Sequence, residues 1–393
     1  MISVEEALEH IRSNRPELGD ELISIQDALG RILSEDVIAS LNMPPFTSAN
    51  MDGYAVADCK ARYPLNIIGY SAAGHPFAGK VRMGEAVRIS TGAMIPSGAD
   101  RVLIKENATE GQDKVIVRIA PKKGTHIRPL GSDFKTGETL LKAGQILRVA
   151  DLTICAAAGI TKLLVLKKLT LALLSCGDEL VPAEKDLQTG QIYAANTVGL
   201  AALLRSWSVE VTIFDPVKDT ADSISSVLSK LSNFDIIVPI GGASVGDHDL
   251  MRPSFKAAGF KLLFEKVPLR PGKPCWMGRR DEQIVLGLPG NPASVFVCTQ
   301  IFLRALLNLE IAFLSASLTE PIDENGPRET YLRASTEIRD GNIFVTPFAQ
   351  QDSYRHRPQA EATALIKLAP MGGPFRSGDK IDILLLGDLA QAR

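Results

Sequence analysis

The sequence predicts a multidomain protein of the α/β plus β class, with a three-layer α/β domain whose sheet is mostly parallel. Three observations predict this fold class. The chain has 393 residues, too many for one typical core, which suggests two to four domains. Strand-like apolar runs alternate with helical patterns over 169–310, as in parallel sheets covered by helices. The flanking regions instead contain short apolar runs between turn residues, which is typical of small β domains.

The segments 1–41 and 138–168, on either side of a β-rich stretch, are expected to be largely helical. Ser3 and Glu6 have the spacing of a capping box, so an amphipathic helix is expected to begin there. Further helical patterns lie near Ile25–Leu33 and over Leu147–Gly159.

A β-rich module is expected over 42–137. Met51–Tyr54 has the pattern of an Asp-Gly hairpin turn, and a second cluster of turn residues covers Ser90–Asp100. The short apolar runs between turns include Leu65–Ile68, Ala86–Ile89 and Val115–Ile119.

The α/β domain is expected over 169–310. Its strands are expected at Leu169–Ser175, Val209–Phe214, Asp235–Ile240, Lys261–Val267 and Gln283–Leu288. Its helices are expected at Thr197–Trp207, Ala221–Leu231, Pro253–Gly259 and from Pro292 to about Leu309. Ligands of such sheets bind at the carboxyl ends of the strands, which directs attention to the turns that follow them.

A C-terminal domain resembling a β-barrel is expected over 311–393. Its predicted strands are Tyr331–Ala334, Ile343–Thr346, Ala364–Leu368 and Asp382–Leu386.

Composition excludes several classes of function. The net charge of -2 gives no overall basic field, so neither nucleic acid nor a membrane is expected as a partner. No apolar stretch reaches the length of about 18 residues that crosses a membrane, and the N-terminus lacks the pattern of a signal peptide. Five scattered cysteines support neither a disulfide framework nor a zinc site. A cytoplasmic location is expected.

Acidic residues follow two of the predicted strands. The turn Ser175–Leu180 contains Gly177 and Glu179, and Asp219 follows the strand at Val209–Phe214. The first turn places Asp178 and Glu179 at the carboxyl end of its strand, where they could serve a site or cap a helix, and Asp219 is more often a helix cap than a ligand.

A glycine-rich turn, 241–249, follows the strand at Asp235–Ile240. Its glycines allow backbone N–H groups to approach an anion closely, and Asp247 and Asp249 suit magnesium. The alternative is an ordinary flexible turn, which we disfavour because such dense glycine lowers stability.

Three cations, Lys266, Arg270 and Lys273, surround a proline-containing turn and suit a phosphate or another oxyanion. Asn291 and Pro292 fit the start of a helix at the same edge. Together, the turns fit a magnesium-bound phosphate ester, although they do not define the reaction.

The order of motifs resembles the molybdopterin molybdenumtransferase family, which includes bacterial MoeA and the gephyrin E domain. The motifs that carry the resemblance span nearly the whole chain: Pro45-Phe46, Met51–Val56, Ser90–Asp100, Gly131–Asp133, Gly177–Leu180, Gly241–Asp249, Pro271–Pro274 and Gly287–Pro292. The resemblance implies an elongated four-part subunit, in which 1–41 and 138–168 together form an elongated helical or linker domain. It implies that the subunit works as a homodimer with a shared site. It also implies that molybdate is inserted into adenylylated molybdopterin and that AMP is released, with Mg²⁺ as the cofactor. Further partners that it implies are the molybdopterin adenylyltransferase and apo-molybdoenzymes.

The resemblance also implies which residues act. The implied catalytic positions are Asp52, Thr91, Asp133, Glu179, Asp219 and Asp249, of which Glu179, Asp219 and Asp249 would hold the metal. The implied substrate-binding positions are Ser175, Gly177, Asn196, Gly241, Gly242, Ser244, Gly246, Lys266, Arg270, Lys273, Pro289, Pro292 and Arg328.

The chain departs from the family pattern at Ala49, Cys176, Ala194 and over 351–363. Two alternatives to an active transferase therefore stay open. One is a diverged paralogue that binds pterin, nucleotide or a partner molybdoenzyme without turnover. The other is an unrelated magnesium-dependent nucleotidyl or phosphoryl transferase, which would leave the motifs of the β-rich module unexplained.

Overall fold

The computed structural model describes residues 1–242 and 250–387, which fall into two compact units. The first unit comprises Met1–Leu18 and Lys168–Arg393, and the second comprises Gly19–Lys167. The Lys167 N–H donates a hydrogen bond to the Gly19 carbonyl, so the two ends of the second unit are adjacent. The second unit is therefore an insertion into the first.

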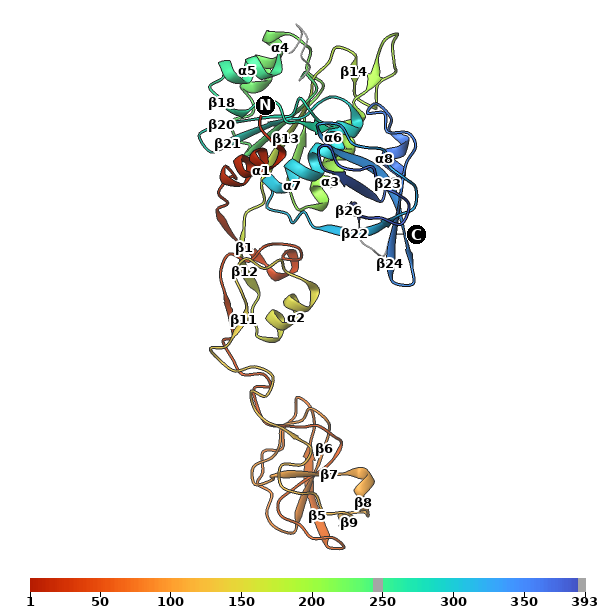
Figure 1. Cartoon of the computed structure of the whole chain (residues 1–393). Coiled ribbons are helices and arrows are strands. Elements are labelled where there is room, and N and C mark those ends of the chain that lie inside the picture. The colour runs from red at the N-terminus through yellow and green to blue at the C-terminus, as the bar shows by residue number, and fades with distance from the viewer. Residues whose placement is uncertain (243–249, 388–393) are drawn as a thin grey trace. The chain divides into compact units, whose positions relative to one another are not determined.

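The first unit is built on a six-stranded sheet in the order β16-β13-β17-β21-β20-β18. Figure 1 labels β13, β18, β20 and β21 of this sheet. Its strands are β13 Thr170–Ser175, β16 Glu210–Ile213, β17 Ile236–Ile240, β18 Lys261–Phe264, β20 Trp276–Arg280 and β21 Gln283–Gly287. Strands β16, β13, β17 and β21 are parallel, whereas β20 and β18 are antiparallel to their neighbours. The predicted mostly parallel sheet is confirmed, with β20 as an additional strand.

Helices cover both faces of this sheet. Side chains alternate along β13, so Leu171 and Leu173 enter one core and Ala172 and Leu174 enter the other. The second of these cores is covered by α4 Ala221–Leu228 and α5 Met251–Ala257. The first is covered by α1 Val4–Ser13, α3 Ala195–Ser206 and the consecutive segments α6 Pro292–Cys298, π-helical Thr299–Leu303 and α7 Arg304–Leu306. The three-layer prediction is thus confirmed.

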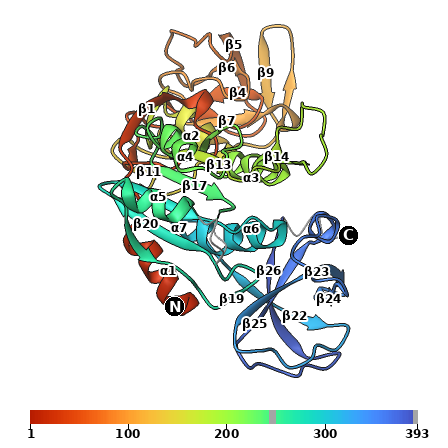
Figure 2. The same ribbon diagram turned by 90° about the horizontal axis from the view of Figure 1, so that it is seen from above.

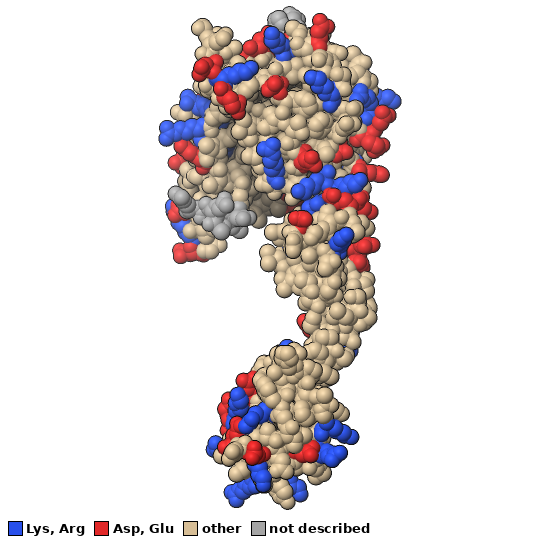
Figure 3. Space-filling view, turned by 180° about the vertical axis from the view of Figure 1, so that it is seen from behind, with Lys and Arg blue, Asp and Glu red and all other residues tan. Residues whose placement is uncertain are grey.

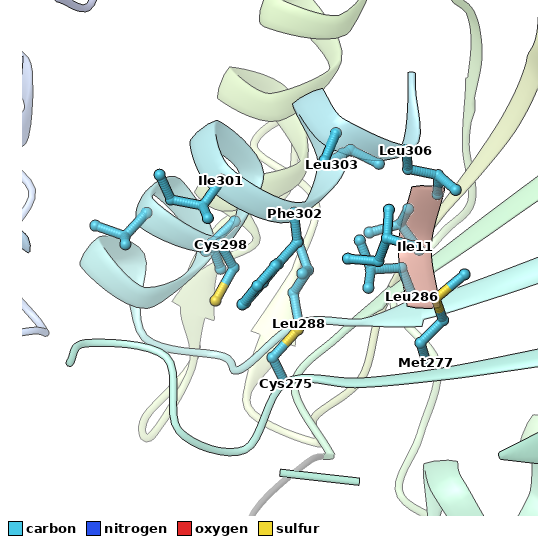
Figure 4. Close-up of a cluster of buried hydrophobic side chains, with 14 of the residues drawn as sticks. Ile11, Cys275, Met277, Leu286, Leu288, Cys298, Ile301, Phe302, Leu303 and Leu306 are labelled. Atoms are coloured by element: carbon cyan, nitrogen blue, oxygen red, sulfur yellow. The ribbon is translucent and has the colours of Figure 1, made fainter. Parts of the chain in front are cut away.

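Helix α1 begins as the sequence predicts. The Ser3 hydroxyl accepts from the Glu6 N–H, and the Glu6 carboxylate accepts from the Ser3 N–H, which completes the capping box. Figure 4 shows Ile11 of this helix beside Leu303 and Leu306, above Met277 and Leu286 of the sheet.

The C-terminal region forms a closed β-barrel of five strands, which confirms the predicted barrel-like domain and adds β22 to the four predicted strands. The five strands are β22 Phe313–Leu318, β23 Glu329–Arg339, β24 Asn342–Pro347, β25 Ala364–Leu368 and β26 Lys380–Leu385, with the short helix α8 Arg357–Glu361 before β25. The ring closes because β25 pairs with both β26 and β23. β19, Leu269–Arg270, pairs in parallel with β23 and so connects the α/β region to the barrel (Figure 2).

The second unit contains a six-stranded sheet in the order β7-β4-β6-β5-β9-β8. Its strands are β4 Gly53–Val56, β5 Pro64–Ser71, β6 Glu85–Ile89, β7 Arg101–Ile104, β8 Ala108–Glu110 and β9 Lys114–Val117. The rest of the unit consists of three strand pairs and a helix: β1 Asp20–Ser24 with β12 Lys162–Leu166, β2 Val37–Ile38 with β11 Thr139–Leu141, β3 Ser48–Ala49 with β10 Ile127–Arg128, and α2 Val149–Ala157.

Two local predictions in the second unit are wrong. Only Ile25–Asp27 of the expected helix at Ile25–Leu33 is helical, as a 3-10 turn. Gly30 then adopts a φ of 74°, and Leu33 forms a β-bridge with Val165, so tertiary pairing overrides the helical pattern. Met51–Tyr54 is not a hairpin turn, because β4 pairs with β6 and β7 rather than with β3.

Within the described residues, no helix is long and apolar enough to cross a membrane. On the face that Figure 3 shows, basic and acidic side chains are interspersed over both units. Neither unit therefore presents a surface of one sign on that face.

Candidate functional site

A cavity of about 650 Å³ lies where β13 and β17 end in the first unit. Its volume is within the range of sites for small organic ligands, and its place is where parallel sheets bind them. The structure brings nine of the predicted residues to its walls: Ser175, Gly177, Glu179, Asn196, Asp219, Gly241, Gly242, Pro289 and Pro292.

Asp219 is held in the wall of this cavity by two neighbours. Its carboxylate accepts a hydrogen bond from the Cys176 Sγ at 2.8 Å, and its N–H donates to the Asp178 carboxylate at 3.2 Å. Burial raises the pKa of Cys176, and the bond to Asp219 raises it further, so the thiol stays protonated. Cys176 thus acts as a hydrogen-bond donor that orients a carboxylate, and not as a nucleophile.

Gly241 closes the floor of the cavity. It has a φ of 88°, and a Cβ at this position would lie 2.7 Å from the Cys176 carbonyl oxygen. Its N–H donates to the Leu288 carbonyl, which ties the turn to the strand beside it. Only glycine fits this conformation and this approach without strain.

Ser175 and Asn196 offer polar groups to the same cavity. The Ser175 hydroxyl is buried and has no hydrogen-bond partner among the described residues. An unpaired buried hydroxyl is costly, so it fits a polar ligand atom that completes its bonding. The Asn196 amide donates to the Gly290 carbonyl at 2.8 Å and so joins the start of α3 to the turn before α6.

A second cavity, of about 450 Å³, lies between the α/β region and the barrel. Four cationic side chains line it: Arg270, Lys273, Arg328 and Arg333. Pro274 lines both cavities, so they adjoin. Three of the predicted substrate-binding residues, Arg270, Lys273 and Arg328, line this smaller cavity, whereas Lys266 lines neither cavity.

Arg333 also lines the smaller cavity, although it was not among the residues predicted from the sequence. Its side chain is buried and donates to the Gln351 side chain and to the carbonyls of Asp352 and Arg355. Burial lowers the pKa of this guanidinium, although Asp352 opposes the shift. An arginine inside the predicted strand Tyr331–Ala334 was the available signal, because a charge in such a place needs partners.

The chain segment that departs from the family pattern supplies lining residues to both cavities. Gln351, Asp352 and Ser353 line the smaller one, and Tyr354 and His356 line the larger one. Tyr354 and His356 were not among the predicted residues.

The other departures have structural roles. Ala49 is buried in β3, where its N–H donates to the Ala93 carbonyl. Ala194 lines the larger cavity, and its N–H donates to the Val181 carbonyl.

In the second unit, Asp52 and Thr91 form a surface cluster. The Asp52 carboxylate accepts from the Thr91 N–H at 2.7 Å and from its hydroxyl at 2.9 Å, and Lys105 lies 3.7 Å away. The bonds from Thr91, with a smaller contribution from Lys105, lower the pKa of Asp52. Asp133 is exposed, and its N–H donates to the Met43 carbonyl.

Three predicted residues, Ser244, Gly246 and Asp249, lie outside the described residues. The structure therefore shows only Glu179 and Asp219 of the predicted metal ligands. Among the residues that the structure describes, there is no group of three or more His, Cys, Asp and Glu side chains arranged to hold a metal ion.

Three family models match the chain in order. The MoeA N-terminal region (domain I and II) matches residues 2–159, a probable molybdopterin binding domain matches 172–308, and the MoeA C-terminal region (domain IV) matches 315–386. The sheet with the larger cavity falls within the second match. The first unit therefore contains an α/β domain of the class described as a probable molybdopterin binding domain.

Full-length relatives agree with these matches. Molybdopterin molybdenumtransferases from Staphylococcus aureus and from Nostoc are 30% and 32% identical to this chain. The alignments cover 98% and 93% of this chain and 95% and 88% of those proteins. A solved molybdopterin biosynthesis MoeA protein from Pyrococcus horikoshii is 26% identical, with a TM-score of 0.86 over 99% of this chain and 100% of that one.

The chain belongs to the molybdopterin molybdenumtransferase (MoeA) family and is a transferase of molybdenum cofactor biosynthesis.

Proposed function

We propose that this protein inserts molybdate into adenylylated molybdopterin and releases AMP and the molybdenum cofactor. One observation carries the proposal. Two adjoining cavities share Pro274, and one presents carboxylates whereas the other presents four cations. This is the arrangement that a phosphate ester with a bound metal ion and a separate oxyanion would need.

The carboxylates of the larger cavity suit Mg²⁺, which prefers oxygen ligands. Glu179 and Asp219 would hold the ion with Asp249, and the ion would neutralise charge on the phosphate groups. The Cys176 thiol keeps Asp219 oriented toward that role. The unpaired Ser175 hydroxyl would donate to a substrate oxygen, and the absence of side chains at Gly241 and Gly242 in the cavity wall would allow close approach.

The smaller cavity would hold molybdate as a substrate. Lys273 and Arg270 are exposed in its wall, and Arg328 and Arg333 come from the barrel side. A tetrahedral dianion beside several cations is held by charge and by directed N–H donors. The contribution of the protein would then be positioning and electrostatic stabilisation, without a covalent nucleophile.

We further propose that the enzyme works as a cytoplasmic homodimer, whose site is completed by Asp52, Thr91 and Asp133 of the partner subunit. The support is that Asp52 is fixed by two bonds from Thr91 although it lies at the surface. The adenylyltransferase would supply the substrate, and apo-molybdoenzymes would accept the product.

The test of the reaction uses purified protein with adenylylated molybdopterin, Mg²⁺ and molybdate, and follows AMP and cofactor. We expect AMP release that depends on Mg²⁺. Wild-type protein that binds the substrate and releases no AMP would favour the non-catalytic paralogue instead.

The test of the shared site mixes two impaired variants, Glu179→Ala and Asp52→Ala, after subunit exchange. If each site combines both subunits, mixed dimers contain one intact site, and about a quarter of wild-type activity should return. A protein that sediments as a monomer at micromolar concentration, or a mixture with no activity, would contradict the shared site.

A further inference from the structure

We propose that Tyr354 and His356 bind the planar heteroaromatic ring of the substrate in the larger cavity. The inference rests on the proposed function and extends it, because these residues come from the barrel and not from the α/β region. It also assigns a role to the segment in which this chain departs from its family.

The position of the two side chains is the first support. Both line the larger cavity together with the strand ends that carry Glu179 and Asp219. Tyr354 is 63% exposed. Its ring is therefore accessible to a ligand in that cavity.

The loop that carries them is firmly anchored, which is the second support. Buried Arg333 bonds to the side chain of Gln351 and to the carbonyls of Asp352 and Arg355. The Ser353 carbonyl accepts from the Ala293 N–H at 3.0 Å, so the loop is also tied to the start of α6. Tyr354 and His356 are thus presented by a fixed backbone.

The ring of Tyr354 is also oriented. The Arg355 guanidinium lies 5.4 Å from the ring centroid and is itself held by the Asp352 carboxylate at 2.9 Å. A cation over one face leaves the opposite face of the ring for stacking. A preorganised aromatic face loses little conformational entropy when a planar ligand binds.

The remaining lining has matching chemistry. The two residues of strand β15, Ile192–Tyr193, line the same cavity and are exposed. They add apolar surface to a wall that otherwise contains carboxylates and glycines. The cavity thus offers aromatic and apolar groups for a flat ring, and polar groups for phosphate. Two rings of the substrate have this chemistry, the adenine and the pterin, and the experiment distinguishes them.

The experiment measures binding of two probes, AMP with Mg²⁺ and 6-hydroxymethylpterin, to the full-length protein by calorimetry. The variants are Tyr354→Ala, Tyr354→Phe and His356→Ala. The control is Tyr63→Ala, because Tyr63 is equally exposed, at 63%, but lies in the second unit. Thermal unfolding of each variant verifies that it folds.

We expect Tyr354→Ala to weaken one probe by about tenfold, as loss of a stacked aromatic does, and Tyr354→Phe to retain most of the affinity. His356→Ala should weaken the same probe. In turnover, both alanine variants should raise KM with kcat nearly unchanged, because the ring does not react. If the affinity for AMP falls, Tyr354 and His356 bind the adenine ring. If the affinity for 6-hydroxymethylpterin falls, they bind the pterin ring.

Unchanged binding of both probes by the alanine variants, with wild-type AMP release intact, would overturn this inference and leave the proposed function standing. Equal weakening by Tyr63→Ala would overturn it as well. A wild-type protein that binds neither probe and releases no AMP would instead reject the proposed function, and this inference with it.

Discussion

The first unit places most of its described predicted functional residues in the walls of cavities, whereas the second unit has its own at its surface. Glu179 and Asp219 follow different strands and converge because parallel strands end at the same edge. Asp52 and Thr91 also come from distant points of the chain, but they converge through direct hydrogen bonds. We therefore expect the first unit to bind a ligand by itself. We expect the Asp52–Thr91 cluster of the second unit to act on a ligand that is bound to another surface.

The sharpest test of this comparison removes Asp219. We expect Asp219→Ala to lower kcat for AMP release by about 100-fold or more, since one carboxylate of the proposed metal site and the acceptor of Cys176 are lost. The measurement is AMP release at saturating substrate. Asp215→Ala is the control, because Asp215 is exposed and lies outside the cavity. Equal activity of the two variants would remove Asp219 from the reaction.

The anchor of the cavity wall should matter for stability. We expect Arg333→Met to cost about 3 kcal/mol, because several buried acceptors lose their donor. Urea unfolding of the full chain gives the value. Arg357→Met is the control, because Arg357 has an 89% exposed side chain and pairs only with Glu361 on the surface, so its change should stay within about 0.5 kcal/mol. Similar costs for both would show that Arg333 is not an anchor.

The second unit should show its own pH dependence. Burial raises the pKa of Tyr54 to about 12, and its bond to Glu110 adds to the shift. The folded state therefore favours the protonated phenol, and this contribution is fully present below the ordinary tyrosine pKa of about 10. It is lost as pH rises from about 10 through about 12. The expected loss of stability is about 2 kcal/mol over this interval.

Thermal unfolding between these pH values checks the Tyr54 prediction. Tyr54→Phe should flatten the alkaline decline, whereas Tyr70→Phe should keep it, because the Tyr70 ring is exposed and its hydroxyl meets only Ser90. A decline of equal slope in Tyr54→Phe would mean that another group causes it.

The smallest expected effect concerns the surface cluster. Asp52→Asn should lower turnover by about tenfold while AMP affinity stays within about twofold, since the cluster would act in the reaction and not in ring binding. Asp113→Asn, at another exposed position of the second unit, should leave both unchanged. If Asp52→Asn weakens AMP binding as strongly as it slows turnover, the second unit also contributes to ligand binding, and the proposed difference between the two units is wrong.

The features that could be predicted are those fixed by local pattern and by topology. The capping box at Ser3 required only the Ser-x-x-Glu spacing. The convergence of Glu179, Asp219 and Gly241 required only strand periodicity and the rule that ligands bind at strand ends. β20 escaped prediction because its apolar run is short and ends in Arg279 and Arg280, and its place depends on antiparallel pairing with β21.

The features that could not be predicted depend on contacts between distant segments. Arg333 becomes part of a site only because the barrel closes and brings the Gln351–His356 loop over it. The thiol of Cys176 orients Asp219 across 43 residues of sequence, which no spacing rule indicates. Tyr354 and His356 lay in a stretch that differs from the family pattern, where resemblance offered no guidance.

The adjacency of Gly19 and Lys167 has a practical consequence. Because one hydrogen bond joins the points where the chain leaves and re-enters the first unit, a short loop in place of the residues between them would close the first unit without moving its ends. The second unit is thus an insertion that could be excised as a whole. Its removal would separate the residues proposed to hold the substrate from Asp52, Thr91 and Asp133, which are proposed to act from a second copy.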